Sequence, residues 1–197
     1  MKKFFTIFLF SLIFLTNINY SFSIEPDVFV QSTVSKAAET LGGKFTKEER
    51  VEKLKKIAEE AVDIRGIGFY SLGSHRKGLN KDQLNTYEKV FREYFLKSFS
   101  SRLAEYTNPE IDVNNKEILN KNYTIVNSTL KGTKERPEVK IDWRIYTKDP
   151  NNPLIRDLII EGLSLARTQK EEFSSILNSN DNNINILFKT LEEFSKN

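Results

Sequence analysis

The chain has 197 residues, of which 39% are hydrophobic, 12% aromatic and 29% charged, a globular composition that excludes a disordered or collagen-like chain. It contains no cysteine and one histidine, which excludes disulfides, cysteine nucleophiles, thiolate metal sites and any multi-histidine zinc site. The formal net charge is +3, and without the two lysines of a predicted targeting segment 28 basic residues face 27 acidic ones, so no nucleic-acid partner is expected.

The N-terminus has the pattern of a secretory signal peptide. Two lysines precede the apolar run Phe4–Leu15, which is shorter than the roughly 20 residues that span a bilayer. Ser21 and Ser23 put small residues at the −3 and −1 positions of a cleavage site. We therefore predict a signal peptide over residues 1–23, a single mature domain over residues 24–197, and a periplasmic location. A retained hydrophobic anchor is the alternative interpretation.

The first half of the predicted mature chain has helical periodicity. Apolar residues three or four positions apart predict a helix over residues 27–41. Thr46 and Glu49 form a capping-box pattern that opens a second helix, which runs to about Val62. The lysines and glutamates of this second helix are expected to form a solvated face rather than a binding patch.

A third helix, over residues 63–72, carries Gly66 and Gly68. Each glycine weakens a helix by about 1 kcal/mol relative to alanine, so a helix that keeps both is expected to pack closely against a neighbour. Residues 73–78 are predicted to form a loop, in which His75 is expected to be solvated rather than catalytic.

The longest predicted helix begins at an N-cap formed by Asn80 and Gln83 and runs to about Tyr106. Its apolar stripe is dense in aromatic residues, which include Phe91 and Phe95. This stripe has two interpretations: it packs in a filled core, or it forms one wall of an apolar cavity.

The periodicity then changes to that of β-strands. Strands are predicted over residues 110–113, 123–130, 139–146 and 154–165. In the third of them apolar and polar residues alternate without a break, so one face is expected to be buried and the other to be wet.

The fourth predicted strand contains Glu161 and Gly162 within an otherwise apolar segment. A glycine inside a strand usually marks a bulge or a close approach, and we interpret this pair as a bulge that turns the strand into the next helix. Two final helices are predicted, over residues 168–177 and 184–194.

Catalytic and cofactor motifs are missing from the sequence. It contains no P-loop, no dinucleotide-binding glycine motif, no nucleophile elbow and no zinc-protease motif. The acidic residues of the second helix alternate with lysines along a polar face, which does not favour a carboxylate acid–base pair. We therefore predict no catalytic residue, no cofactor and no metal.

Three segments resemble the MlaC family of periplasmic phospholipid-binding proteins, also called the toluene-tolerance or ABC-transporter auxiliary-component family. The first runs from Asp63-Ile64-Arg65 to Leu72-Gly73, and the second from Tyr87 through Phe91-Arg92-Glu93-Tyr94 to Tyr106. The third and most specific begins at Asp157, continues through Glu161-Gly162-Leu163-Ser164, and ends at Thr168–Phe173.

The resemblance implies an α+β fold similar to the NTF2-like cone, in which helices pack on a curved, mostly antiparallel sheet and enclose an apolar cavity. It also implies a phospholipid carrier rather than an enzyme. Its partners would be phospholipid, an inner-membrane ABC transporter complex and an outer-membrane lipoprotein complex. The predicted lipid-binding residues are Phe69, Leu72, Tyr87, Phe91, Tyr94, Phe95, Ile141, Trp143, Ile145, Leu158 and Ile160.

Two other functions stay open. A ligand-free periplasmic adaptor would have a filled core and an exposed apolar patch. An enzyme on an NTF2-like scaffold would need a polar, titratable cluster inside the cone, but the candidates Asp142 and Glu161 are expected to lie outward or at an interface.

Overall fold

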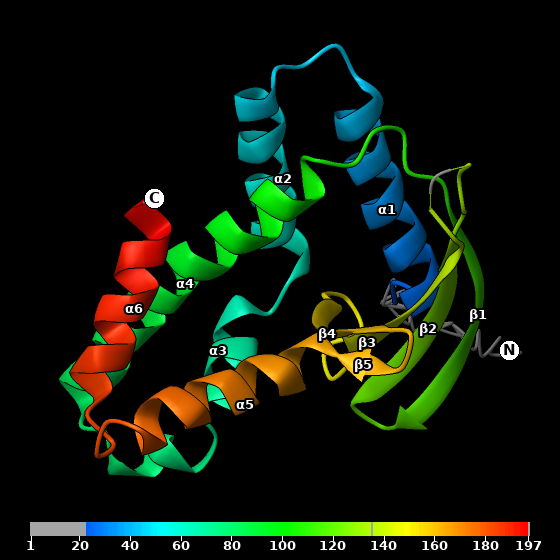
Figure 1. Ribbon diagram of the computed structural model, residues 1–197. Helices are drawn as coiled ribbons and strands as arrows, with labels where there is room; N and C mark the ends of the chain where they lie inside the picture. The colour runs from blue at the N-terminus through cyan, green and yellow to red at the C-terminus, as the bar shows by residue number, and fades with distance from the viewer. Residues whose placement is uncertain (1–22, 135, 197) are drawn as a thin grey trace, which may run out of the picture.

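The structure is a computed structural model that describes residues 23–134 and 136–196. Over these residues, six α-helices pack on a five-stranded antiparallel sheet (Figure 1), which confirms the predicted α+β class. Apart from Ser23, the predicted signal peptide lies outside the described residues. None of the described helices combines the length and the apolarity that crossing a bilayer requires.

Four of the helices come first in the chain. They are α1 (Pro26–Gly42), α2 (Lys47–Ala61), α3 (Ile64–Leu72) and α4 (Lys81–Leu103). Between α3 and α4 the segment Gly73–Gly78, predicted as a loop, forms the short 3-10 helix η1.

Side-chain caps define the starts of α2 and α4 as the sequence predicts. The Thr46 hydroxyl accepts from the Glu49 backbone N–H, and the Glu49 carboxylate accepts from the Thr46 N–H. Asn80 and Gln83 make the same reciprocal pair at α4. Each box satisfies two backbone donors that the first turn of a helix leaves unpaired.

The sheet is a meander in which neighbours in sequence are neighbours in space. Its strands are β1 (Ile111–Asn120), β2 (Tyr123–Leu130), β3 (Val139–Tyr146), β4 (Leu154–Ile160) and β5 (Leu163–Ser164). The alternation predicted for β3 is confirmed, because its side chains at positions 141, 143 and 145 are buried while those between them are at least partly exposed.

Strand β1 is longer than predicted. The sequence indicated only residues 110–113, yet β1 continues to Asn120 and pairs with β2 along its length. Residues 114–120 are all exposed, so this edge segment lacks the apolar alternation that marks a strand in sequence. Backbone hydrogen bonds to β2 hold it instead.

The predicted bulge at Glu161-Gly162 is wrong, because these two residues form the turn of a tight hairpin between β4 and β5. Both have positive φ, 49° and 82°, which is typical of a two-residue hairpin turn. The chain reverses here, and α5 (Leu165–Asn178) begins three residues earlier than predicted. The last helix, α6, spans Ile184–Lys196.

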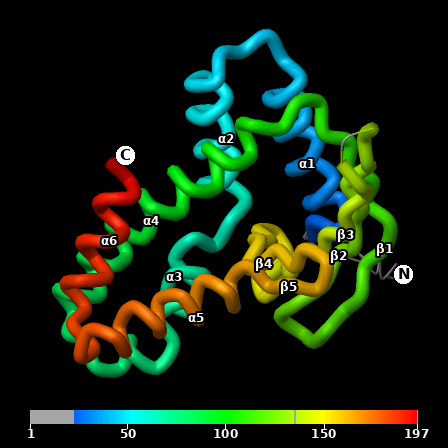
Figure 2. Tube along the Cα trace, in the orientation of Figure 1, coloured from blue at the N-terminus to red at the C-terminus, as the bar shows by residue number. Residues whose placement is uncertain are grey.

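The helices and the sheet occupy different sides of the molecule (Figures 1 and 2). Helix α1 lies against β1 and β2, α4 packs between α2 and α6, and α3 packs against α5. The C-terminal helix α6 lies on the side away from the sheet (Figure 2). The main cluster of buried apolar residues runs from Val30 on α1 to Leu191 on α6 and includes side chains from both halves.

Candidate functional site: an apolar cavity between helices and sheet

A cavity of about 370 Å³ lies between the helices and the sheet. Its walls come from the four helices α1 to α4, from the four strands β1 to β4, and from the first turns of α5. This volume falls in the range of roughly 300–1,000 Å³ that is typical of small-molecule sites, which are mostly apolar with few polar groups.

Small side chains form part of the cavity wall on two of the helices. Helices α1 and α2 present Ala37, Ala38, Ala58 and Ala61 to it. Alanine methyl groups leave space that leucine or phenylalanine would fill, so these four positions contribute to the open volume. The sequence analysis missed these positions, since a short alanine on a helical stripe is an ordinary core residue in sequence.

The opposite walls consist of large apolar groups. Helix α4 contributes its aromatic stripe, and the sheet contributes Trp143 and its neighbours. The indole N–H of Trp143 donates to the Ser128 hydroxyl at 2.8 Å, and that hydroxyl donates to the Ile141 carbonyl at 3.0 Å. The single polar atom of the indole is thereby satisfied within the sheet, so the ring can form an apolar wall at no hydrogen-bonding cost.

Seven of the eleven predicted lipid-binding residues line this cavity. They are Phe91, Tyr94, Phe95, Ile141, Trp143, Leu158 and Ile160. The structure therefore brings the aromatic stripe of α4 and one face of β3 and β4 together around one space. This favours the cavity-wall interpretation of that stripe.

Four predicted residues lie outside the lining: Phe69, Leu72, Tyr87 and Ile145. Leu72 and Ile145 are 0% exposed and pack entirely among other side chains. The sequence pattern correctly showed that Ile145 points inward. It could not distinguish an inward side chain that meets other side chains from one that meets a cavity.

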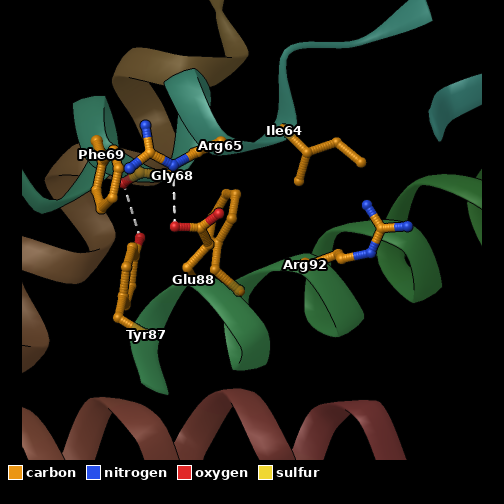
Figure 3. Close-up of a pocket in the computed structure, with 8 residues that line it drawn as sticks. Ile64, Arg65, Gly68, Phe69, Tyr87, Glu88 and Arg92 are labelled. Atoms are coloured by element: carbon orange, nitrogen blue, oxygen red, sulfur yellow. Dashed lines mark hydrogen bonds and ion pairs between the residues drawn. The ribbon is translucent and has the colours of Figure 1, made fainter. Parts of the chain in front are cut away.

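Tyr87 and Phe69 line a second, much smaller cavity of about 50 Å³ between α3 and α4 (Figure 3). The Tyr87 hydroxyl donates to the Gly68 carbonyl at 2.8 Å, and Arg65 donates to Glu88 beside it. A Cβ on Gly68 would lie 2.7 Å from the Phe91 ring, which confirms the close packing expected for this helix. A space of this size holds a few waters at most, so it is not the ligand site.

The Phe69 ring contacts two cations and does not line the large cavity. The guanidinium groups of Arg65 and Arg76 lie 4.5 and 4.6 Å from the centre of its ring. These distances are typical of cation–π contacts.

Three charged residues belong to the lining of the large cavity: Arg102, Asp157 and Glu172. Asp157 is 3% exposed and accepts from the Ser164 hydroxyl at 2.6 Å and the Ala166 backbone N–H at 3.0 Å. It therefore connects β4 to the start of α5 and has little capacity left for a ligand.

The other two charges mark the mouth of the cavity, which we define by the exposed lining residues Arg102, Leu165 and Glu172. Behind it, the Tyr94 hydroxyl donates to the Gln169 side-chain oxygen at 2.9 Å, and the Gln169 amide donates to Glu172 at 3.0 Å. Burial and the Glu172 carboxylate raise the pKa of Tyr94, while Arg102 acts in the opposite direction. Both mouth charges therefore act on the same hydroxyl.

The candidates for acid–base chemistry do not belong to the cavity lining. Asp142 accepts from the Asn127 side-chain amide at 2.7 Å, and Glu161 accepts from the Lys140 backbone N–H at 2.6 Å. His75 lies in η1, also outside the lining. Within residues 23–134 and 136–196, no three His, Asp or Glu side chains gather as metal ligands would. The arrangement suits the binding of an apolar molecule.

Comparison with known proteins agrees with this geometry. The family model of the MlaC protein matches residues 30–193. A solved structure of a phospholipid-binding protein from Ralstonia solanacearum, in complex with a phospholipid, is similar with a TM-score of 0.73. The two sequences are 18% identical, and the similarity covers 88% of this chain and 98% of that one, so the chains share their fold. No curated protein sequence matches the chain significantly.

Proposed function

Because the chain belongs to the MlaC family, we propose that it is a carrier that binds a diacyl phospholipid with the acyl chains in the large cavity. The observation that carries this proposal is the cavity itself. It is large and apolar, and its few charged groups are either engaged within the fold or located at the mouth. The phospholipid bound to the structurally similar Ralstonia protein supports the same ligand class.

The energetics of the cargo explain why such a carrier needs an enclosed cavity. Two acyl chains contain roughly 30 methylene groups, and each costs about 0.8 kcal/mol in water, so exposing them costs on the order of 20 kcal/mol. A shallow surface groove would leave part of that area wet. A cavity walled by Phe95, Trp143 and Leu158 removes apolar area from water on several sides at once.

The route of transport is part of the proposal. The predicted signal peptide and the family support a periplasmic protein that moves lipid between an outer-membrane lipoprotein complex and an inner-membrane ABC transporter complex. In this role the protein is not an enzyme, and it needs no cofactor. The adaptor alternative requires a filled core in place of the 370 Å³ cavity. The enzyme alternative requires a titratable cluster inside, whereas Asp157, the one buried carboxylate in the described part of the chain, is engaged in holding α5.

The decisive experiment is native mass spectrometry of protein purified mildly from a bacterial periplasm, followed by lipid extraction. We expect one diacyl phospholipid per chain, and uptake of phospholipid from vesicles by delipidated protein. Finding neither bound phospholipid nor uptake would favour the adaptor.

A pair of variants on β4 links the lipid to this cavity. Leu158 lines the cavity, and its neighbour Ile159 does not. Leu158→Glu places a carboxylate among the acyl chains, and because water can enter the emptied cavity and solvate it, the fold is expected to survive with little lipid. Ile159→Glu introduces the same charge on the other face of the strand and is expected to keep its lipid. Equal lipid loading of the two variants would mean that the cargo sits elsewhere.

A further inference from the structure

Since a head group at the mouth would lie beside the Arg102 guanidinium, we propose that Arg102 binds the phosphate of the phospholipid. This inference rests on the proposed function, because it names the polar contact made by the ligand of the same cavity. It adds chemical selectivity, since a lipid with the same acyl chains and no phosphate would lack this contact.

The position of Arg102 is the first argument. Among the described residues that line the large cavity it is the one cation, and it lies in the last turn of α4. Apart from Asp157, the buried residues of the lining are apolar, whereas Arg102 is exposed at the mouth. A phospholipid with buried acyl chains places its phosphate at the boundary between the apolar space and water.

The availability of the Arg102 side chain is the second argument. Several other arginines are engaged: Arg65 donates to Glu88, Arg92 pairs with Glu59, and Arg156 donates to Asp63 and to the Tyr123 hydroxyl. Within the described part of the chain, the guanidinium of Arg102 has no ion-pair or hydrogen-bond partner. Five N–H donors in a planar fork match the oxygens of a phosphate, which an arginine can bind in bidentate geometry.

The remaining polar groups at the mouth indicate on which side the phosphate lies. Glu172 repels an anion, and it already accepts from the Gln169 amide. The Tyr94 hydroxyl donates to Gln169 and is not free to donate to a ligand as well. The phosphate is therefore expected beside α4 and away from α5.

The test measures lipid loading of delipidated protein from two matched sets of vesicles. One set contains phosphatidylglycerol, and the other contains diacylglycerol with the same acyl chains in a neutral carrier lipid that lacks phosphate. We expect Arg102→Gln to load phosphatidylglycerol about three- to tenfold less than the unaltered protein and to load diacylglycerol equally well. Raising the salt concentration should reduce this difference, because the contact is at the solvent boundary.

Two control variants separate the phosphate contact from a general charge effect. Arg92→Gln removes one positive charge from the same helix outside the large cavity, and Glu172→Gln neutralises a charge at the mouth that cannot bind phosphate. Neither is expected to lower the loading of phosphatidylglycerol.

Three outcomes would overturn the inference: unchanged loading of Arg102→Gln, an equal drop in both lipids, or an equal effect of Arg92→Gln. Failure of the unaltered protein to take up either lipid would instead contradict the proposed function.

Discussion

At the scale of single residues, Asp157 shows how a polar group belongs to the lining of an apolar cavity without serving the ligand. Its carboxylate accepts from Ser164 and from the first turn of α5, and Arg144 lies 3.7 Å away. Asp157, Ser164 and Thr168 all belong to the most specific segment of the family resemblance. In this structure the Ser164 carbonyl accepts from the Thr168 hydroxyl, so the segment holds a strand to a helix.

We expect Asp157→Ala to destabilise the fold by about 2–4 kcal/mol, because it leaves the Ser164 hydroxyl and the Ala166 N–H buried without an acceptor. Urea denaturation followed by circular dichroism measures this free energy of unfolding. Asp142→Ala is the matched control. Asp142 is only partly buried and accepts one hydrogen bond from Asn127, so a loss of about 1 kcal/mol or less is expected. Similar losses in both variants would show that Asp157 has no special structural role.

Tyr87 is predicted to make the protein sensitive to alkaline pH. Burial raises the pKa of its phenol above the ordinary value near 10, so above that pH the unfolded chain loses a proton that the folded protein keeps. The stabilisation is complete below about pH 10 and decreases above it by up to about 1.4 kcal/mol per pH unit.

The measurement compares the free energy of unfolding of the protein and of Tyr87→Phe between pH 8 and 11.5. The variant loses its hydrogen bond to Gly68, worth about 1 kcal/mol, at every pH. Above pH 10 its stability should fall less steeply, since phenylalanine does not ionise. Parallel curves over the whole range would contradict this account.

At the scale of the elements, periodicity predicted the helices better than it predicted the second half of the sheet. The capping boxes at Thr46 and Asn80 and the alternation in β3 are local signals, and the structure confirms them. At Glu161-Gly162 the sequence carries a local signal for an irregular backbone. It does not show that the chain reverses there, because the reversal places Leu163 opposite Ile160 in a pairing between two strands.

The turn at Gly162 offers a test of this hairpin. Its φ of 82° disfavours any side chain, while a Cβ there would meet no atom within 4 Å. Gly162→Ala is therefore expected to cost about 1 kcal/mol through the backbone alone. Gly78 also has open space around a Cβ but no positive φ, so Gly78→Ala is the control, with little or no loss. Thermal unfolding gives the melting temperatures of both variants. Equal melting temperatures would argue against a strained turn at Gly162.

At the scale of the whole molecule, the central feature is a space that the chain leaves unfilled. Protein interiors are normally close-packed, so a cavity of about 370 Å³ is expected to lower the stability of the empty protein. A bound ligand is expected to offset this loss of stability. Ala37 on α1 borders this space, whereas Ala104 does not and is buried behind Leu41 and Leu54, which do border it.

Ala37→Phe should fill part of the cavity, with little loss of stability in the delipidated protein and a clear fall in the phospholipid that copurifies. Ala104→Phe inserts the same ring into a packed cluster and is expected to cost about 1–3 kcal/mol. Lipid quantification together with thermal unfolding separates the two effects. A stable Ala37→Phe variant with full lipid loading would show that the cargo does not approach α1.

The sequence by itself determined the α+β class, most helix boundaries, the inward face of β3 and the family, because these follow from local periodicity, caps and motif residues. Only the tertiary structure decided which inward residues border a cavity. Ile145 and Trp143 share one face of β3, yet Ile145 meets other side chains and Trp143 borders open space. The size of each side chain is known from the sequence. Whether it borders an open space depends on how elements that are distant in the sequence pack around it.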